Sequence, residues 1–298
     1  MSTDELPAPP QTVPAAADTP QPVPTSDSIP RSEPDYIEWA KSTLNIDFKS
    51  DRTRLQYKQT AAYAQNSLQE HQFFKGLDTF IKECGIQYTS STRSPLLMTE
   101  APVTFYQKTY DSAINKSFRQ NCVLNKKFPE PPNSDGWVTP ANWFSRFNDI
   151  LRTTIVCKYI DGPKMLAESL QKHATAHKLK SRLYSQQSDD GHYAYHFYIF
   201  MPLDLVLENG DVKKIDIQVE IQLTTQLQEV LREMTHRFYE NTRIVRREKD
   251  ATAWKWEHQS SRFRTSYLSH TLHLLEAIIV ELRDSANAAT SPDEEGEQ

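Results

Sequence analysis

The feature that most constrains this chain is the stretch KKIDIQVEIQLTT, residues 213–225, where apolar and polar residues alternate without a break. Alternation with a period of two places the two sets on opposite faces of a β-strand, and the apolar set predicts a buried face. The polar set consists of Asp216, Gln218, Glu220, Gln222 and Thr224. Two carboxylates among amides fit either a solvent-exposed strand face or the wall of a polar cleft.

The segments around this strand predict an α+β protein. Further strands are expected over 149–160, 180–187 and 193–207, and helices over 36–44, 51–84, 103–124, 164–178, 226–243 and 260–283. Turns or loops are expected at 90–95, 126–140 and 161–163. The order predicts a mixed β-sheet core flanked by N- and C-terminal helices. The aromatic residues at 193, 195, 197 and 198 suit either sheet packing or ligand stacking.

The two ends differ from the body in composition. Nine of the 18 prolines precede Asp35, and that segment has no hydrophobic periodicity. Residues 1–34 therefore predict a disordered Pro-rich arm, and residues 285–298 a disordered acidic tail. Between them we expect an N-terminal helical region over 35–100 and a domain over 101–284 that ends in the last helix.

The charge of the body is masked by its ends. The first 34 residues hold five acids and one arginine, and the last eight hold four acids and no base, so 33 basic and 30 acidic residues remain between them. This small surplus suits a phosphate-bearing ligand and is too weak to indicate a nucleic-acid footprint. No glycine-rich phosphate loop occurs, so side chains must hold any phosphates.

The cysteines and the hydropathy point to an intracellular setting. Cys84, Cys122 and Cys157 are far apart and match no metal-ligand spacing, which predicts reduced thiols. No signal peptide and no apolar run of about 20 residues is evident, so we expect a soluble, cytoplasmic protein without a membrane partner.

A basic cluster precedes the strand region. Lys108, Ser112 and Lys116 follow one another at intervals of four residues, and Arg119 comes one turn later. On a helix, the first three would lie on one face. Two lysines placed so close together indicate either a solvated basic face or a bound anion between them.

Two acids complete the candidate site. Asp149 heads one predicted strand, with Arg152 shortly after it, and Glu220 lies on the polar face of another. Mg²⁺ prefers carboxylate and phosphate oxygens, while Lys and Arg offset the charge of a triphosphate. The combination predicts metal-assisted phosphoryl transfer, in which a carboxylate can also take a proton from a hydroxyl.

The order of these segments resembles the RelA/SpoT-like synthetase domain over about residues 105–239. The family helix K-x-x-x-S-x-x-x-K matches Lys108, Ser112 and Lys116, and its strand D-I-x-G-x-R begins at Asp149. The motif G-Y-x-S-x-H matches Gly191 and His196, E-I-Q-I-R-T matches Glu220 to Thr225, and H-x-x-Y matches His236 and Tyr239.

Several positions depart from the family pattern. The arginine expected two residues before Lys108 is Tyr106, and the glycine and arginine after Asp149 are Arg152 and Thr154. The tyrosine that stacks on the acceptor guanine in the family is His192, beside Tyr193 and Tyr195, and the arginine of E-I-Q-I-R-T is Thr224. The departures concentrate on the acceptor side, because the two lysines and both acids are kept.

The resemblance implies a nucleotidyltransferase-like fold and a pyrophosphokinase that moves pyrophosphate from ATP to the 3′-hydroxyl of GDP or GTP. Such enzymes make (p)ppGpp, the alarmone of the stringent response. By this resemblance, Asp149 and Glu220 bind Mg²⁺ and are catalytic. Lys108, Ser112, Lys116, Arg119 and Arg152 would hold the ATP phosphates, and His192, Tyr193, His196 and Gln222 the acceptor. Two alternatives stay open: the same chemistry on the 3′ end of tRNA, and a domain that binds nucleotide without turnover.

Overall fold

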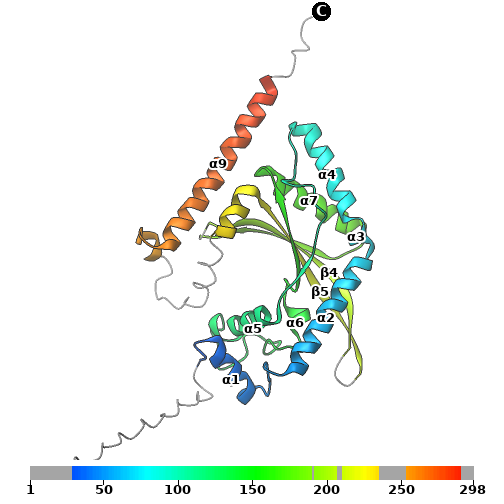
Figure 1. Ribbon diagram of the computed structural model, residues 1–298, viewed down its shortest axis with the longest axis vertical. Coiled ribbons are helices and arrows are strands. Elements are labelled where there is room, and N and C mark those ends of the chain that lie inside the picture. The colour runs from blue at the N-terminus through cyan, green and yellow to red at the C-terminus, as the bar shows by residue number, and fades with distance from the viewer. Residues whose placement is uncertain (1–28, 190, 207–209, 235–252, 290–298) are drawn as a thin grey trace, which may run out of the picture.

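The structure is a computed structural model that describes residues 29–189, 191–206, 210–234 and 253–289. Its centre is one five-stranded mixed sheet with the strand order β1-β2-β5-β4-β3. The strands are β1 (Tyr106–Gln107), β2 (Leu151–Cys157), β3 (Ser181–Gln187), β4 (Tyr193–Val206) and β5 (Val212–Thr225). The predicted α+β class is confirmed, with helices flanking the sheet (Figure 1).

The alternating stretch forms β5 and lies in the middle of the sheet. It runs parallel to β2 and antiparallel to β4, so that Glu220 is the register partner of both Arg152 and Tyr198. A strand paired on both sides satisfies its backbone hydrogen bonds along its length. Glu220 is therefore held on a rigid element rather than on a loop.

Helices flank the sheet, and both buried hydrophobic clusters lie on one of its faces. The helices are α1 (Glu33–Thr43), α2 (Asp51–Glu70), α3 (Gln72–Lys75), α4 (Leu77–Thr92), α5 (Tyr110–Phe118), the π-helical η1 (Arg119–Val123), α6 (Trp143–Arg146), α7 (Asp161–Ala176), the 3₁₀ turn η2 (Ala253–Trp256) and α9 (Ser261–Ala289). Residues 226–234 are also helical. In Figure 1, α2, α3 and α4 line one side of the molecule, α1 and α5 lie at one end, and α9 lies opposite α4.

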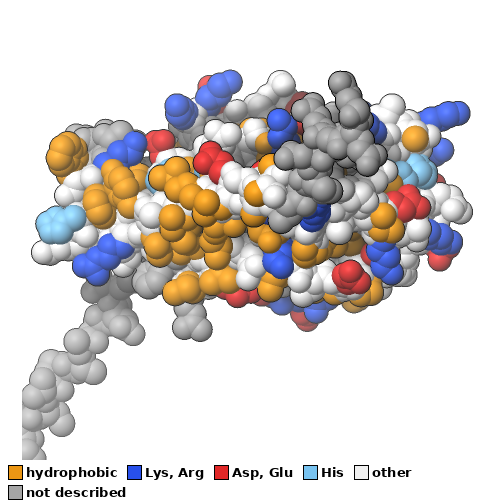
Figure 2. Space-filling model, turned by 90° about the horizontal axis from the view of Figure 1, so that it is seen from above, with side chains coloured by type: hydrophobic (Ala, Val, Ile, Leu, Met, Phe, Trp, Pro, Cys, Tyr) orange, Lys and Arg blue, Asp and Glu red, His pale blue; other side chains and the backbone are white. Residues whose placement is uncertain are grey.

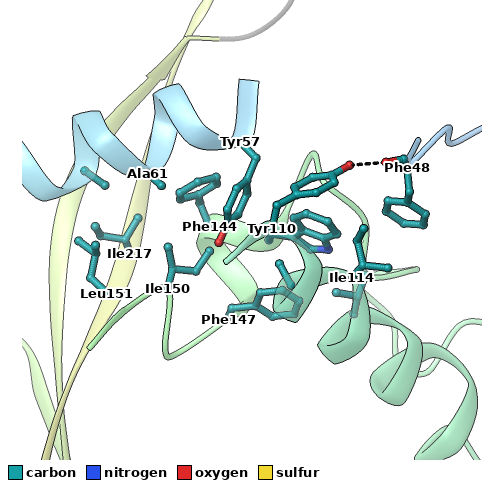
Figure 3. Close-up of a cluster of buried hydrophobic side chains, with 14 of the residues drawn as sticks. Phe48, Tyr57, Ala61, Tyr110, Ile114, Phe144, Phe147, Ile150, Leu151 and Ile217 are labelled. Carbon is teal, nitrogen blue, oxygen red and sulfur yellow. Dashed lines mark hydrogen bonds between the residues drawn. The ribbon is translucent and has the colours of Figure 1, made fainter. Parts of the chain in front are cut away.

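One hydrophobic cluster seats the two segments that carry the candidate site. Tyr110 and Ile114 of α5 pack in it together with Phe147 and Ile150, the residues on either side of Asp149 (Figure 3). The Tyr57 hydroxyl of α2 donates to the carbonyl oxygen of Lys108 at 2.7 Å. The lysines and the first acid are thus fixed to the same core.

The predicted helix over 51–84 is wrong in its continuity and in its end. It is broken near residue 71, where Nδ1 of His71 accepts a hydrogen bond from the Phe73 amide and begins α3. After Gly76 the chain continues as α4 through Gly85 to Thr92, which includes part of the predicted turn. Arg93 ends it in the left-handed region, with φ of 51°.

The predicted helix over 103–124 begins too early in the sequence. Residues 103–109 are extended, β1 pairs with β2, and the Lys108 amide donates to the carbonyl of Ile150. The hydroxyl of Thr109 accepts from the amide of Ser112 and caps α5. Pairing of Tyr106 with Arg152, a distant residue in the sequence, outweighs the local helical spacing.

The predicted turn at 161–163 is the first turn of α7 instead. Pro163 is tolerated there because the first amides of a helix have no intrahelical partner. At Gly162 an added Cβ would lie 2.8 Å from the Cβ of Cys157, so the glycine permits close packing of α7 on β2. Cys84, Cys122 and Cys157 are buried and form no disulfide, as predicted.

Both predicted disordered ends overlap regular structure. Ser32 caps α1, which begins at Glu33, and α9 continues to Ala289. The remainder of the arm and tail lies outside the described residues. Among the residues that are described, no helix is long and apolar enough to cross a membrane.

The last helix is amphipathic as predicted, but its apolar side faces outward. Exposed side chains on α9 include Leu268, Leu274, Leu275, Ile278, Ile279 and Leu282, and hydrophobic side chains gather on this side of the molecule in Figure 2. Its buried side carries Ser266, Ser269 and Glu276. Polar contacts therefore attach α9: Ser269 donates to the carbonyl of Gly191, and Arg283 pairs with Asp161.

Candidate active site

The two faces of the sheet have opposite character. Phe197 of β4 and Val219 and Ile221 of β5 point into the helix-covered core, and all three are fully buried. Their strand neighbours His196, Tyr198, Glu220 and others point the other way. Glu220 is only 7% exposed and His196 8% exposed. This burial favours the polar-cleft interpretation of the alternating stretch over a solvent-exposed face.

Asp149 lies immediately before β2 and is held between two lysines. Its Oδ2 lies 2.8 Å from Nζ of Lys108, and its Oδ1 lies 2.8 Å from Nζ of Lys116. All three side chains are at most 17% exposed. Burial alone would raise the pKa of Asp149, but the two ammonium groups outweigh it and lower the pKa to about 2. Burial lowers the pKa of Lys108, against the opposing effect of Asp149.

The other predicted phosphate-binding residues are less closely placed. Ser112 lies on the exposed side of α5, and its hydroxyl oxygen is 2.8 Å from that of Thr109. Arg119 begins η1 beyond the end of α5 and is half-buried. Arg152 is exposed on β2, directly across from Glu220, and its charge reaches Lys108. The structure brings Lys108, Lys116 and Asp149 into contact, and Arg152 lies within electrostatic reach of Lys108.

Glu220 is held by neutral or titratable groups instead of lysines. Its Oε1 lies 2.6 Å from Nδ1 of His196 and accepts a hydrogen bond from the Tyr198 hydroxyl at 3.2 Å. Burial and the neighbouring Glu220 charge both raise the pKa of Tyr198, so its hydroxyl keeps its proton and acts as a donor. Among the described residues, no hydrogen bond to Oε2 of Glu220 occurs.

Asn148 and Tyr198 each contact one of the charged groups of the site. Nζ of Lys116 donates to Oδ1 of Asn148 at 2.6 Å, and the hydroxyl of Tyr198 donates to Oε1 of Glu220. No sequence signal pointed to Asn148, and Tyr198 stood out only as one of several aromatic strand residues.

Two polar atoms on the same face lack partners. Nε2 of His196 and Oε1 of Gln218 are buried and make no hydrogen bond within the described part of the chain. Buried polar atoms are rarely left unpaired unless a water or ligand completes them. Gln218 belongs to the polar set of the alternating stretch, so its position, although not its role, was predictable.

The residues predicted for the acceptor are split between the two faces. Gln222 is the register partner of His196, and both lie on the polar face. The ring of His192 is 6.3 Å from that of His196. Tyr193 falls on the opposite face, where its ring stacks on His273 of α9 at 3.6 Å. His236 and Tyr239 lie outside the described residues.

Tyr193 is also fixed through its hydroxyl. This group lies 2.6 Å from Nδ1 of His270, so both ends of the side chain are engaged with α9. The packing interpretation therefore applies to Tyr193, and the structure does not bring it together with the other acceptor residues.

The donor set suits a hard cation shared with a substrate. No group of three or more His, Cys, Asp or Glu side chains able to hold a metal occurs among the described residues. Mg²⁺ needs only one or two carboxylates when phosphates and water supply the other oxygens. The oxygens of Asp149 and the unbonded Oε2 of Glu220 fit that requirement, provided that the lysines move to the phosphates.

Comparisons with known proteins were made by sequence and by structure. No protein-family model matches the chain, and no curated protein is significantly similar to it in sequence. Several solved structures are similar in fold.

The crystal structure of small alarmone synthetase 1 from Bacillus subtilis aligns with a TM-score of 0.46 and 18% identity, covering 81% of this chain and 100% of that one. The same synthetase bound to its product pppGpp aligns with a TM-score of 0.47 and 17% identity over the same shares.

A GTP pyrophosphokinase family protein from Streptococcus pneumoniae aligns with a TM-score of 0.43 and 18% identity, covering 73% of this chain and 91% of that one. Because these identities and TM-scores are low, the function of this chain has to be inferred from its own side chains.

Proposed function

We propose that this chain is a pyrophosphokinase that transfers the β,γ-pyrophosphoryl group of ATP to the 3′-hydroxyl of a guanine nucleotide, GDP or GTP. One observation carries the proposal. A mostly buried Asp149, paired with Lys108 and Lys116, lies just before β2, and the neighbouring strand β5 carries a second buried acid, Glu220, on the polar face of the sheet.

The lysines would bind the triphosphate. In the chain alone, their positive charges are matched by one carboxylate, which leaves a net positive charge in a mostly buried place. A triphosphate offers more negative charge than Asp149 does, so the ammonium groups can turn to its oxygens. Arg152 is exposed on β2, where it is the register partner of Glu220, and it would contact the same phosphates. Ser112 and Arg119 would lie at the edge of the phosphate site.

Glu220 would accept the proton in the transfer. The acceptor 3′-oxygen forms a bond to the β-phosphorus of ATP, the bond from that phosphorus to the α,β-bridging oxygen breaks, and AMP leaves. The hydroxyl proton passes to the carboxylate of Glu220, whose Oε1 is fixed by Tyr198 and His196. A bound Mg²⁺, held by Asp149 and Glu220, would neutralise phosphate charge.

The acceptor would lie against the unpaired polar atoms of the same face. Nε2 of His196 and Oε1 of Gln218 are buried without partners among the described residues, and Gln222 and His192 are close by. A nucleotide with its own donors and acceptors would satisfy these atoms.

The test is to incubate the purified full chain with γ-labelled ATP, Mg²⁺ and GDP, GTP or deacylated tRNA. The proposal expects label in the guanine nucleotide and AMP as the co-product. If the label stays in ATP with every acceptor, the proposal is wrong and the chain is a domain that binds nucleotide without turnover.

A tRNA acceptor has one observation in its favour. Lys180 lies 4.9 Å from the ring centre of Phe200, and Arg182 lies 4.8 Å from that of Tyr198, on the side of the sheet that carries Glu220. Cations placed beside aromatic rings suit a single-stranded nucleic acid. In the same assay, label on the 3′ end of tRNA and none on GDP or GTP would support this second function.

A further inference from the structure

The outward side of α9 carries apolar residues at alternating intervals of four and three. We call this series the α9 stripe; it consists of Leu268, Leu272, Leu275, Ile279, Leu282 and Ala286. Such spacing is the heptad pattern of a helix that packs against another helix. If Leu268 is assigned to heptad position d, every d position of the stripe is a leucine.

The rest of the chain does not cover the α9 stripe. Leu268, Leu275, Ile279 and Leu282 are between 43% and 65% exposed, and Tyr267, Leu274 and Ile278 beside them are also exposed. Together these side chains present about 600 Å² of apolar surface, the upper end of the range for the largest patch on a monomer. A patch of this size on one helix indicates an interaction surface.

The inward side of α9 is attached by polar contacts. Ser269 donates to the carbonyl of Gly191, and Arg283 pairs with Asp161. Neither of the two hydrophobic clusters among the described residues includes a residue of α9. Because most of the stability of a helix in a protein comes from packing of its apolar side, α9 needs a partner on its outward side.

The charges of α9 are divided between its two halves. Residues 261–275 contain two arginines and no acid, whereas residues 276–289 contain three acids and one arginine. The helix dipole favours the reverse, because acids stabilise a helix N-terminus and bases a C-terminus. In an antiparallel pair, the basic half of each helix would lie beside the acidic half of the other, while a parallel pair would bring like charges together.

We propose that α9 pairs with α9 of a second copy of this chain as an antiparallel two-helix coiled coil. Matching a with d positions sets Leu268 of one copy against Ala286 of the other, Leu272 against Leu282, and Leu275 against Ile279. Each copy uses the same surface, as a two-fold symmetric dimer requires. Two copies would bury about 1,200 Å², which is the lower limit for a specific interface. The pairing does not depend on the proposed activity.

The first test measures the mass of the full chain in solution. Analytical ultracentrifugation over a range of concentrations should give twice the chain mass of 34.4 kDa. Leu275→Asp should weaken association at least about 100-fold, because each copy would bury an unpaired carboxylate in the interface. Leu55→Asp is the matched control, since Leu55 is an exposed leucine on α2, and its mass should equal that of the wild type.

Circular dichroism of the variants checks that the fold is kept, as expected for substitutions of exposed residues. A wild-type chain that stays at 34.4 kDa at every concentration would overturn the proposal. A dimer that Leu275→Asp leaves intact would also overturn it.

The second test measures the orientation of the two helices and does not depend on Leu275→Asp. Under mild oxidation, a mixture of Leu268→Cys and Ala286→Cys chains should form a disulfide between chains. Leu268→Cys alone should not, because its two copies would lie about 27 Å apart in the antiparallel pair. The native cysteines are buried, so they should not compete. Disulfides in Leu268→Cys alone, or none in the mixture, would overturn the antiparallel pairing.

Discussion

Asp149 and Glu220 are both mostly inaccessible carboxylates, but the protein contacts them in different ways. Asp149 receives two ammonium groups, one on each oxygen, whereas the contacts of Glu220 are a histidine nitrogen and a tyrosine hydroxyl on one oxygen. Lysines on flexible side chains can leave for a more charged partner, whereas side chains packed on a sheet strand stay in place. The Asp149 end is therefore suited to exchanging its lysines for phosphates. The Glu220 end is suited to keeping one carboxylate oxygen available.

The largest effect should follow from removing the free charge at the Glu220 end. Glu220→Gln keeps the shape and can still accept from Tyr198, but it cannot take a proton. We expect kcat to fall about 10³-fold, within the range of general base catalysis, while the unfolding midpoint in urea changes little. Rates from the labelled-ATP assay and a urea titration check both parts. A Glu220→Gln enzyme with the wild-type kcat would show that Glu220 does not accept the proton.

Asp149→Asn should affect stability more than Glu220→Gln does. Removing the charge leaves Lys108 and Lys116 mostly buried without a counter-ion, which costs about 3 kcal/mol when a buried pair loses one partner. Urea unfolding of the two variants, measured side by side, provides the check. Equal stabilities would mean that the lysines are not held by Asp149.

A smaller effect concerns pH. The folded-state pKa of Asp149 is about 2, below its ordinary value of 3.8, so the charged form stabilises the fold. That stability is fully present above about pH 4 and is lost as the pH falls through 2; it amounts to about 2 kcal/mol. The difference in unfolding free energy between wild type and Asp149→Asn should therefore shrink from pH 5 towards pH 2. A constant difference over that range would contradict the pairing.

The smallest effect concerns Arg182, the cation nearest to the Tyr198 ring at the Glu220 end. Arg182 stacks on the Tyr198 ring but makes no salt bridge with Glu220 among the described residues. If that end needs no cation, Arg182→Ala should change kcat with a guanine nucleotide less than threefold. It should also cost about 0.5–1 kcal/mol of stability, as for an exposed cation–π contact. A rate loss of about 10-fold or more would mean that the cation helps to hold Glu220.

The strands were largely predictable from the sequence because their signals are local. The period-two alternation of residues 213–225 needs no distant partner to be recognised, and β5 covers the same stretch. Helix ends were harder to predict. The start of α5 depends on pairing of β1 with β2, and the break after α2 depends on a ring nitrogen of His71 acting as a cap. Residue spacing contains neither interaction.

The site was predictable to the extent that its residues share a motif. Lys108, Lys116 and Asp149 meet, although Lys108 lies before the helix rather than on it. The contacts of Tyr198 with Glu220 and of Asn148 with Lys116 join residues 22 and 32 positions apart, and nothing in the local sequence indicates them. The outward apolar face of α9 was missed for a similar reason, because periodicity shows that a helix has two sides and not which side faces the sheet.

A crystal structure of the full chain with Mg²⁺ and a non-hydrolysable ATP analogue will show whether both acids act on one triphosphate. We expect phosphate oxygens at the Nζ atoms of Lys108 and Lys116, with the carboxylates of Asp149 and Glu220 facing one cation between them. An analogue seated on the other face of the sheet, for example in the cavity lined by Lys164, Gln228 and His273, would contradict it.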